Sequence, residues 1–382
     1  MFYHKLGKVP RKRHVVVKNG DQLVYEKLMG QEGFSGVSSL LYKDQIPCSA
    51  VDVSPLIGRK PSTGDCNTNL NYKHYKTQQL NPDSNVFSAR SPLLENSEVE
   101  ISVSTYLYSG IFVNSSCHEV YFIEEGEGNL LSEFGVLAVS SGDYVVIPKG
   151  LYYQWDIKTS VKYILIQSKQ AIKFPKRYLN AMGQFLEDSP ICERDINVPS
   201  HLDPIFDKRE HKILGRRDDT YFEVTLDHHP FDTIGWDGYL YPYSISIHDF
   251  EPLVGRLHMP PPIHQMFESA NFVICNFVPR LYDFHPEAVP APYYHHNVDS
   301  DEVLYYVKGN FMSRSGIEQG SITLHPAGLV HGPQPGKVLE SIGKKKTDEL
   351  AVMIDTFQPL YSSKRAEDIS VKDYHKSWLE NK

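Results

Sequence analysis

Short hydrophobic runs, separated by turn-forming residues, make up most of the chain. The runs are rich in Val, Ile, Tyr and Phe, and Gly, Pro, Asn and Asp stand between them. Clear examples lie at residues 98–108, 118–126, 136–148, 161–167 and 302–309. Runs of this length and composition are typical of β-strands, and many short strands with turns between them indicate sandwiches or barrels. We therefore expect an all-β fold with few helices.

Three segments depart from this pattern. Residues 174–189 have Pro175 near their start and apolar residues at roughly helical spacing, which predicts a helix on the outside of a β unit. Residues 256–265 and 284–294 are rich in proline. They are expected to be linkers in which the chain changes direction without regular hydrogen bonding.

Length and charge narrow the possible functions. With 382 residues, the chain is long enough for two packed units that share a substantial core. It has 39 Lys and Arg against 47 Asp and Glu, a formal net charge of −8. This balance argues against nucleic acid or a membrane as the main partner and favours a small molecule. There is no run of about 18 apolar residues and no apolar signal region, so we expect a cytoplasmic protein.

The cysteines point to no site of their own. Their number is odd and no two of them form a CxxC pair. They are Cys48, Cys66, Cys117, Cys192 and Cys275. Neither a disulfide framework nor a thiolate zinc site is indicated, and a reducing compartment fits best.

A pattern that occurs twice gives the chain its organisation. Each copy begins with Glu, six residues and Gly, at residues 119–126 and 302–309. Each continues with a glycine turn, five strand residues, Pro, any residue, Gly and two residues before a final position. That position is Tyr153 in the first copy and His331 in the second.

This two-part pattern resembles the signature of the cupin family, whose small jelly-roll barrels hold metal ligands on facing strands. Two copies imply a bicupin with two jelly-roll β-barrel units. We expect an N-terminal cupin domain without a complete metal site at 1–240, and a C-terminal cupin domain that carries the site at 241–382.

Applied to the second copy, the template gives His295, Glu302 and His331 as metal ligands. Two histidines and one carboxylate can form a facial triad that leaves coordination positions open for substrate and dioxygen. A lone histidine at a strand edge is more often solvated or hydrogen-bonded than a ligand. Three residues that fall in both halves of one template favour the metal site.

The first copy lacks this ligand set. Its final position is Tyr153, and residues 114–116 before Glu119 are Asn, Ser and Ser. We expect this barrel to be a scaffold without metal.

Along most of its length the chain is similar to the homogentisate 1,2-dioxygenase family. The motifs that carry the resemblance are LGKVPRKRH (6–14), YEKLMGQEGFSGVSSLLY (25–42), IGWDGYLYPYSISIHDF (234–250), PYYHHN (292–297) and LHPAGLVHGP (324–333). The resemblance implies an Fe(II)-dependent extradiol-type dioxygenase that converts homogentisate and O2 to maleylacetoacetate in tyrosine and phenylalanine catabolism. It also implies a homo-oligomer, either a trimer or a hexamer.

Carried over to this sequence, the resemblance makes His295, Glu302 and His331 the iron ligands. It makes His325 a substrate-site residue that hydrogen-bonds a ring hydroxyl. It places His258 as a base towards the substrate phenol.

The substrate site also departs from the family in this chain. The family usually reads Tyr-Tyr-His-Arg-Asn where this chain has Tyr294, His295 and His296 in Tyr-Tyr-His-His-Asn, which places Tyr294 and His296 beside the substrate. Strand alternation favours His296 as the ligand, and the motif favours His295. Phe311 replaces a family tyrosine that contacts the substrate carboxylate, so recognition of the acetate arm is weakened.

Two alternatives therefore remain open. A related cupin dioxygenase acting on gentisate or another hydroquinone carboxylate would use the same triad. A non-catalytic bicupin that binds a small acid would need no iron.

Overall fold

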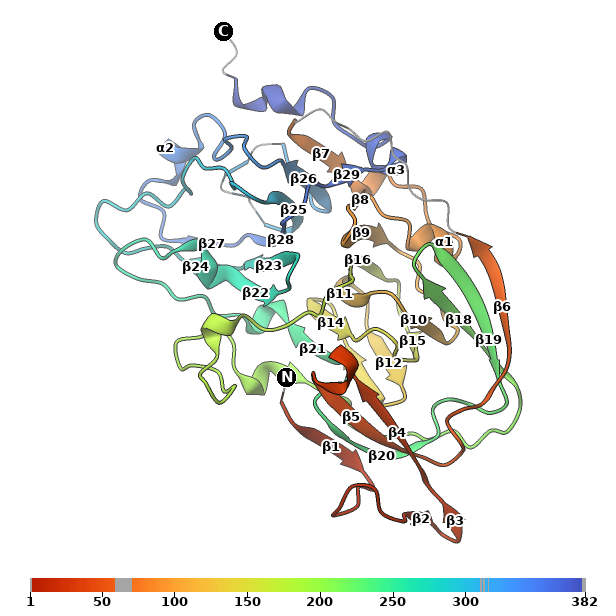
Figure 1. Ribbon diagram of the computed structural model, residues 1–382. Helices are drawn as coiled ribbons and strands as arrows, with labels where there is room; N and C mark the ends of the chain where they lie inside the picture. Colours follow the sequence, from red (N-terminus) through yellow and green to blue (C-terminus); the bar gives the residue numbers. More distant parts are fainter. Residues whose placement is uncertain (1, 59–70, 310, 312, 315, 380–382) are drawn as a thin grey trace.

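The computed structural model is built almost entirely from β-strands (Figure 1). It describes residues 2–58, 71–309, 311, 313–314 and 316–379. Within these ranges the α-helices have only four or five residues each, at α1 (Val86–Ala89), α2 (Lys337–Ser341) and α3 (Lys364–Glu367). The predicted all-β fold with few helices is confirmed.

Two large sheets form the first barrel. One has the order β17 (Ile196–Asn197), β21 (Tyr243–Ser246), β14 (Asp143–Ile147), β11 (His118–Glu125), β16 (Lys162–Ser168), β9 (Val99–Ser104), β8 (Leu94–Glu95) and β29 (Tyr361–Ser362). The other has the order β13 (Gly135–Val139), β12 (Gly128–Ser132), β15 (Tyr153–Ile157), β10 (Phe112–Asn114), β18 (His211–Arg217), β19 (Thr220–Leu226) and β6 (Ala50–Gly58). Their inner faces meet in one core, where the rings of Tyr121 and Trp155 pack edge to face with centres 5.0 Å apart.

A third sheet carries the second copy of the repeated pattern. Its order is β22 (Gln265–Glu268), β23 (Phe272–Phe277), β28 (Leu350–Thr356), β25 (Asp301–Lys308), β26 (Ser321–His325) and β7 (Lys73–Lys76). Side chains alternate across a strand, so Val303 and Tyr305 of β25 enter the core shared with the first barrel. Glu302, Leu304 and Tyr306 point to the other face, where they line a cavity.

A smaller sheet near the N-terminus covers one end of the first barrel (Figure 1). Its order is β1 (His4–Gly7), β20 (Thr233–Gly238), β5 (Ser38–Lys43) and β4 (Tyr25–Gly30). Trp236 of β20 is fully buried, and its Nε1–H donates to the carbonyl oxygen of Phe134 at 2.9 Å. Two further pairs join β2 (Lys18–Asn19) to β3 (Gln22–Leu23) and β24 (Arg280–Leu281) to β27 (Lys346–Thr347).

Some strands pair with the half of the molecule that is distant in sequence. β7 from the N-terminal region pairs with β26, while β21 and the C-terminal β29 complete the eight-stranded sheet of the first barrel. A boundary at residue 240 between 1–240 and 241–382 stays a prediction, and these three strands cross it.

The helix predicted at 174–189 is wrong. The segment holds one short 3-10 turn, η3 (Lys176–Tyr178), followed by turns. The side chain of Asn180 accepts hydrogen bonds from the backbone N–H groups of Met182 and Gln184 at 2.9 and 3.1 Å. These local bonds compete with a helical ladder, and Gly183 adopts a φ of +82° that a helix cannot contain.

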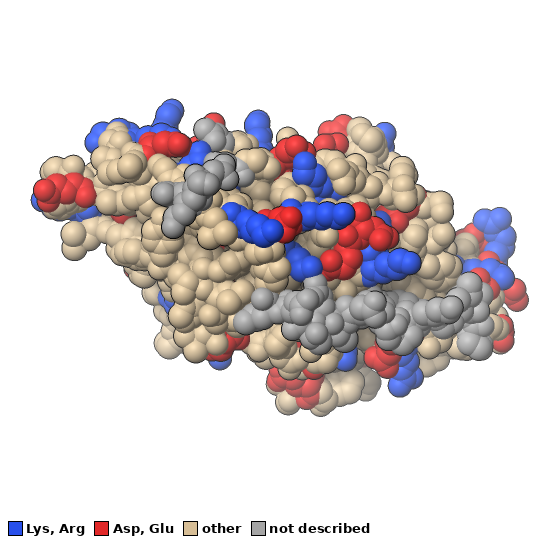
Figure 2. Space-filling view, turned by 90° about the horizontal axis from the view of Figure 1, so that it is seen from above, with Lys and Arg blue, Asp and Glu red and all other residues tan. Residues whose placement is uncertain are grey.

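The surface charges, the helices and the cysteines bear on what the sequence predicts. On the face shown in Figure 2, acidic and basic side chains lie next to one another. Among the described residues, no helix is long and apolar enough to cross a membrane. Cys48, Cys117, Cys192 and Cys275 are free thiols, and Cys66 lies outside the described residues.

Candidate metal centre

Three side chains converge beside the six-stranded sheet: His295, Glu302 and His331. One ligand atom from each lies within 4.8 Å of the other two. His295 Nε2 is 3.7 Å from Glu302 Oε2, and His331 Nε2 is 3.4 Å from Glu302 Oε1. Donor atoms on one face of an octahedral ion lie about 3 Å apart, so a small inward movement would complete the set.

Backbone pairing holds the two histidines together. The N–H of His295 donates to the carbonyl oxygen of His331 at 2.8 Å, and the N–H of His331 donates back at 2.7 Å. This bridge places the two imidazole rings with centres 4.5 Å apart. Glu302, near the start of β25, faces the same side through strand alternation. Two separate segments and one strand thus supply the three ligands.

The hydrogen bonds of the imidazoles leave one nitrogen of each free for a metal. Nδ1 of His295 is 2.9 Å from the carbonyl oxygen of Tyr293, and Nδ1 of His331 is 3.0 Å from that of Leu329. A carbonyl can only accept, so both Nδ1 atoms carry a proton, and Nε2 is the nitrogen of each ring that could bind a metal. The hydrogen bond to Glu302 raises the pKa of His295. Nε2 of His331 is buried and has no hydrogen-bond partner among the described residues. This orphaned donor atom beside a carboxylate fits a metal ion.

Glu302 is ionised and held by a second layer of contacts. Burial favours a higher pKa for Glu302, but hydrogen bonds from the surrounding histidines outweigh it and lower the pKa well below its usual value. His325 Nδ1 is 2.7 Å from Glu302 Oε1, and His325 Nε2 is 3.4 Å from an Nη2 of Arg314. Arginine can only donate, so Nε2 accepts and Nδ1–H donates to Glu302. Burial lowers the pKa of His325 to about 4, which keeps this imidazole neutral.

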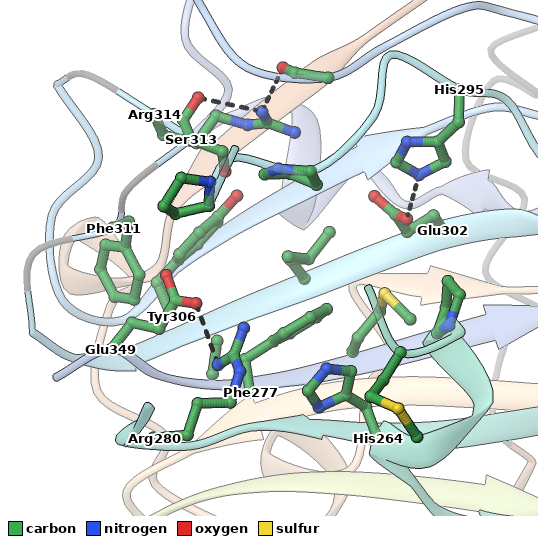
Figure 3. A pocket seen from close by; sticks show the side chains of 18 of the residues that line it. His264, Phe277, Arg280, His295, Glu302, Tyr306, Phe311, Ser313, Arg314 and Glu349 are labelled. Carbon is green, nitrogen blue, oxygen red and sulfur yellow. Dashed lines mark hydrogen bonds and ion pairs between the residues drawn. The ribbon is translucent and has the colours of Figure 1, made fainter. Parts of the chain in front are cut away.

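A cavity of about 180 Å³ opens beside His295 and Glu302 (Figure 3). Alternate residues of β25 and β28 form one wall. The two proline-rich stretches form another, with His258, Met259, Pro261 and His264 from one and Pro290 and Pro292 from the other. The remaining lining residues are Phe277, Arg280, His295, Glu302, Leu304, Tyr306, Phe311, Ser313, Arg314, Gly332, Glu349, Ala351 and Met353. The site is therefore a metal-type ligand set at the edge of a largely apolar pocket.

Comparison with known proteins places this site in a family. A model of the homogentisate 1,2-dioxygenase N-terminal domain matches residues 98–247, and one of the C-terminal domain matches 244–382. A protein of Saccharolobus solfataricus, whose name describes it as an inferred dioxygenase, is 39% identical over 388 aligned residues, covering 99% of each chain. This chain belongs to the homogentisate 1,2-dioxygenase family.

More distant family members carry the enzyme's full name. Homogentisate 1,2-dioxygenase of Bradyrhizobium diazoefficiens is 25% identical over 290 residues, which cover 70% of this chain and 62% of that enzyme. Among solved structures, a conserved-barrel cupin protein from Leptotrichia buccalis aligns with a TM-score of 0.28 at 8% identity, covering 69% of this chain and 86% of that one. Family membership and the all-β strand arrangement together establish a bicupin.

The structure brings only some of the predicted substrate residues to the pocket of this dioxygenase-family chain. Phe311 lines it and packs edge to face on Tyr306, with ring centres 4.5 Å apart. His258 also lines it, with Nδ1 2.9 Å from Asp283 Oδ2 and about two fifths of its side chain exposed (42%). His325 is fully buried behind Glu302 and is not among the lining residues.

Tyr294 and His296 lie on the outside of the pocket. Both are exposed, and neither is among the residues that line it. His295, between them, points to Glu302, as expected where consecutive residues of an extended segment face opposite sides. The geometry therefore assembles the ligand group with His295 and not with its neighbour.

Sequence reasoning missed several polar residues of the pocket. Arg280 pairs with Glu349 at 3.3 Å across one wall, and Arg314 stands in another. Burial, with the nearby Arg280 charge, lowers the pKa of His264 to about 3, so this lining residue is neutral. These residues come from loops and short strands outside the cupin template, and no spacing rule identifies them.

Asp355 is a further polar residue of the site that the pattern did not reveal. It lies directly opposite Glu302 in the pairing of β25 with β28. Burial first, and then the charge of Glu302, raise the pKa of Asp355 well above its usual value. The one available signal was an acidic residue inside the apolar run LAVMIDTF at 350–357.

The first barrel shows what replaces the ligand set. Phe112 pairs with Tyr153 across β10 and β15, as His295 pairs with His331, and Phe112 likewise precedes its glutamate by seven residues. The guanidinium of Arg90 forms an ion pair with Glu119 and lies 4.4 Å from the ring centre of Phe112. Tyr153 donates to Glu119 Oε2 at 2.6 Å. A permanent cation, Arg90, thus compensates the buried glutamate.

Proposed function

We propose that this chain is an Fe(II)-dependent dioxygenase that opens the aromatic ring of homogentisate. The observation that carries the proposal is the convergence of His295, Glu302 and His331 at the edge of an apolar pocket, in a member of this family. The balanced reaction adds both atoms of O2 to the ring and yields maleylacetoacetate.

The three ligands would hold iron by one face. Fe(II), when bound, would supply a redox-active Lewis acid for O2 and the phenol of the substrate. Nδ1–H contacts with Tyr293 and Leu329 keep both imidazoles in the ligating tautomer. His325 donates a hydrogen bond to Oε1 of Glu302, so the carboxylate is oriented with Oε2 facing His295.

Pocket residues would bind the ring and handle its proton. Phe277, Leu304 and Met353 present apolar surface that excludes water from the ring. Nδ1 of His258 is tied to Asp283, so its Nε2 keeps a lone pair that can take the phenol proton. The Asp283 carboxylate then stabilises the imidazolium that forms.

Gentisate is a second candidate substrate. Phe311, packed on Tyr306, offers no hydroxyl to an acetate arm. A carboxyl group attached directly to the ring would need less reach and would use the same three ligands.

The test is oxygen consumption by anaerobically purified, Fe(II)-loaded protein with homogentisate, beside gentisate, with product absorbance followed. We expect rapid uptake with homogentisate, about one O2 per ring, and loss of at least a hundredfold in Glu302→Gln. Turnover of gentisate but not of homogentisate would show that gentisate is the substrate. No uptake with either ring, despite bound iron, would contradict the proposal and favour a binding protein.

A further inference from the structure

Arg314 is a buried cation in the wall of the pocket. It lies in the connection between β25 and β26, three residues after Phe311, and the residue is about 6% exposed. It lines the same cavity as His295 and Glu302. In the view of Figure 3, Arg314 and His295 stand in the upper wall, and Arg280 and His264 stand in the lower wall.

The contacts of Arg314 leave one edge of its guanidinium free. Nη1 donates to the carbonyl oxygens of Ser313 and Gly332 at 3.2 and 2.5 Å. Nη2 lies at the long distance of 3.4 Å from His325 Nε2. Nε is buried and has no hydrogen-bond partner within 3.5 Å among the described residues. The hydroxyls of Tyr306 and Tyr374 lie near the guanidinium, and its carbon is 5.3 Å from the ring centre of Trp378. Nε–H and one Nη2–H share an edge of the guanidinium, which is the fork that binds a carboxylate through two hydrogen bonds.

Arg314 also has no carboxylate in direct contact among the described residues. No carboxylate in the described part of the chain forms an ion pair with it, and the carboxylate of Glu302 is reached only through His325. The other arginine of the pocket differs, because Arg280 pairs with Glu349 at 3.3 Å. A buried cation without a partner is costly unless an anion joins it.

The charge of the whole pocket points in the same direction. Among the arginines and glutamates that line the pocket, Arg280 and Arg314 balance Glu302 and Glu349. A divalent metal ion would therefore leave the loaded pocket with an excess of about two positive charges. Such a pocket favours an anionic ligand over a neutral one of the same shape.

We propose that Arg314 binds the carboxylate of the substrate and so selects rings that carry an acid group. This inference rests on the proposed function, since it takes the ring to be held at the metal. Nη2 of Arg314 contacts Nε2 of His325, and Nδ1 of the same imidazole contacts the carboxylate of Glu302. One imidazole ring therefore separates the guanidinium of Arg314 from the carboxylate of Glu302. Homogentisate carries its acid arm ortho to a hydroxyl, so a ring held by that hydroxyl beside Glu302 would present the arm to the cavity that Arg314 lines. Arg314 thereby supplies the recognition that Phe311 cannot.

The test measures binding without turnover. Fe(II)-loaded protein is titrated anaerobically, by calorimetry, with homogentisate and with methylhydroquinone, which has the same ring and a neutral methyl arm. We expect Arg314→Gln to weaken homogentisate binding about 10- to 100-fold and methylhydroquinone binding less than about threefold. Arg314→Lys should lie between Arg314→Gln and the native chain.

Matched comparisons separate this role from a structural one. Equal losses for both rings would mean that Arg314 only supports the wall, and a selective loss in Arg280→Gln instead would assign the role to Arg280; either result overturns the inference. Melting temperatures check each variant. If Arg314→Gln does not fold, Arg314→Lys and the native chain decide, and a native chain that binds both rings equally well overturns the inference.

The same titrations distinguish failure of the proposed function. If neither ring consumes O2, yet homogentisate binds with the expected dependence on Arg314, the carboxylate site stands and the dioxygenase assignment falls.

Discussion

Single side chains decide whether a cupin barrel of this molecule can hold a metal. In the second barrel, Nε2 of His295 and Nε2 of His331 face the carboxylate of Glu302. In the first, Phe112 and Tyr153 stand at the paired positions, and the guanidinium of Arg90 compensates Glu119. In the first barrel, the cation beside the buried glutamate is thus a side chain, Arg90.

Arg90 should therefore be essential to the stability of the first barrel. Arg90→Met leaves Glu119 buried without a counter-charge, which we expect to cost roughly 3–5 kcal/mol in the free energy of unfolding. Urea denaturation measures the change. The double variant Arg90→Met with Glu119→Gln removes both charges and should recover part of the loss. A stability of Arg90→Met within about 1 kcal/mol of the native chain would contradict this account.

At the scale of elements, the glycine of the repeated pattern has a steric reason. Gly309 directly follows β25 and has a φ of +104°, and a Cβ there would lie 2.5 Å from the carbonyl oxygen of Asp348. Gly126, its counterpart in the first copy, also has a positive φ of +119° and would bring a Cβ to 3.0 Å from the backbone of Ser160. The glycine thus allows the strand end to approach the neighbouring hairpin.

Two alanine variants separate strain from clash. Gly316 has a φ of +71°, and a Cβ added there would meet no described atom within 4 Å, so Gly316→Ala should cost only the left-handed strain, about 1–2 kcal/mol. Gly309→Ala adds a backbone collision and should cost at least about 1 kcal/mol more. Chemical denaturation of both variants checks the difference. Equal losses would show that the contact with Asp348 is irrelevant.

Strand elements and the candidate ligand group could be predicted because their signals are short sequence patterns. Runs rich in Val, Ile, Tyr and Phe marked β11, β14 and β25, and the cupin spacing marked Glu302 and His331, which the structure brings together with His295. The helix prediction at 174–189 was wrong because the spacing of apolar residues carries no information about side-chain hydrogen bonds. The side chain of Asn180 accepts hydrogen bonds from nearby backbone N–H groups, and these bonds replace helical ones. Arg314 and Asp355 escaped notice because they join the site only when loops and strands distant from the template pack around it.

At the scale of the molecule, one core joins both barrels and buries several neutral histidines. Burial lowers the pKa of His74 and His118 to about 4 and that of His264 to about 3. The unfolded chain binds protons at these positions below about pH 6.5, whereas the folded chain binds them only near pH 3–4. Their contribution to stability is therefore complete above about pH 6.5 and is lost as the pH falls.

Acid should therefore destabilise the protein well before its carboxylates are neutralised. Each such histidine contributes up to about 1.4 kcal/mol per pH unit between these limits. Urea unfolding at a series of pH values between neutral and mildly acidic should show a steady fall in stability. His118→Gln should reduce the slope by about one proton. A stability that is flat across this range would contradict the assignment of neutral buried histidines.

The central claim is that His295, Glu302 and His331 together bind iron. The most direct measurement is the iron content, by elemental analysis, of protein reconstituted anaerobically with Fe(II) and freed of excess metal. We predict about one iron per chain in the native protein and in His296→Ala, and almost none in His295→Ala. Full iron in His295→Ala together with its loss in His296→Ala would contradict the site described by the structure.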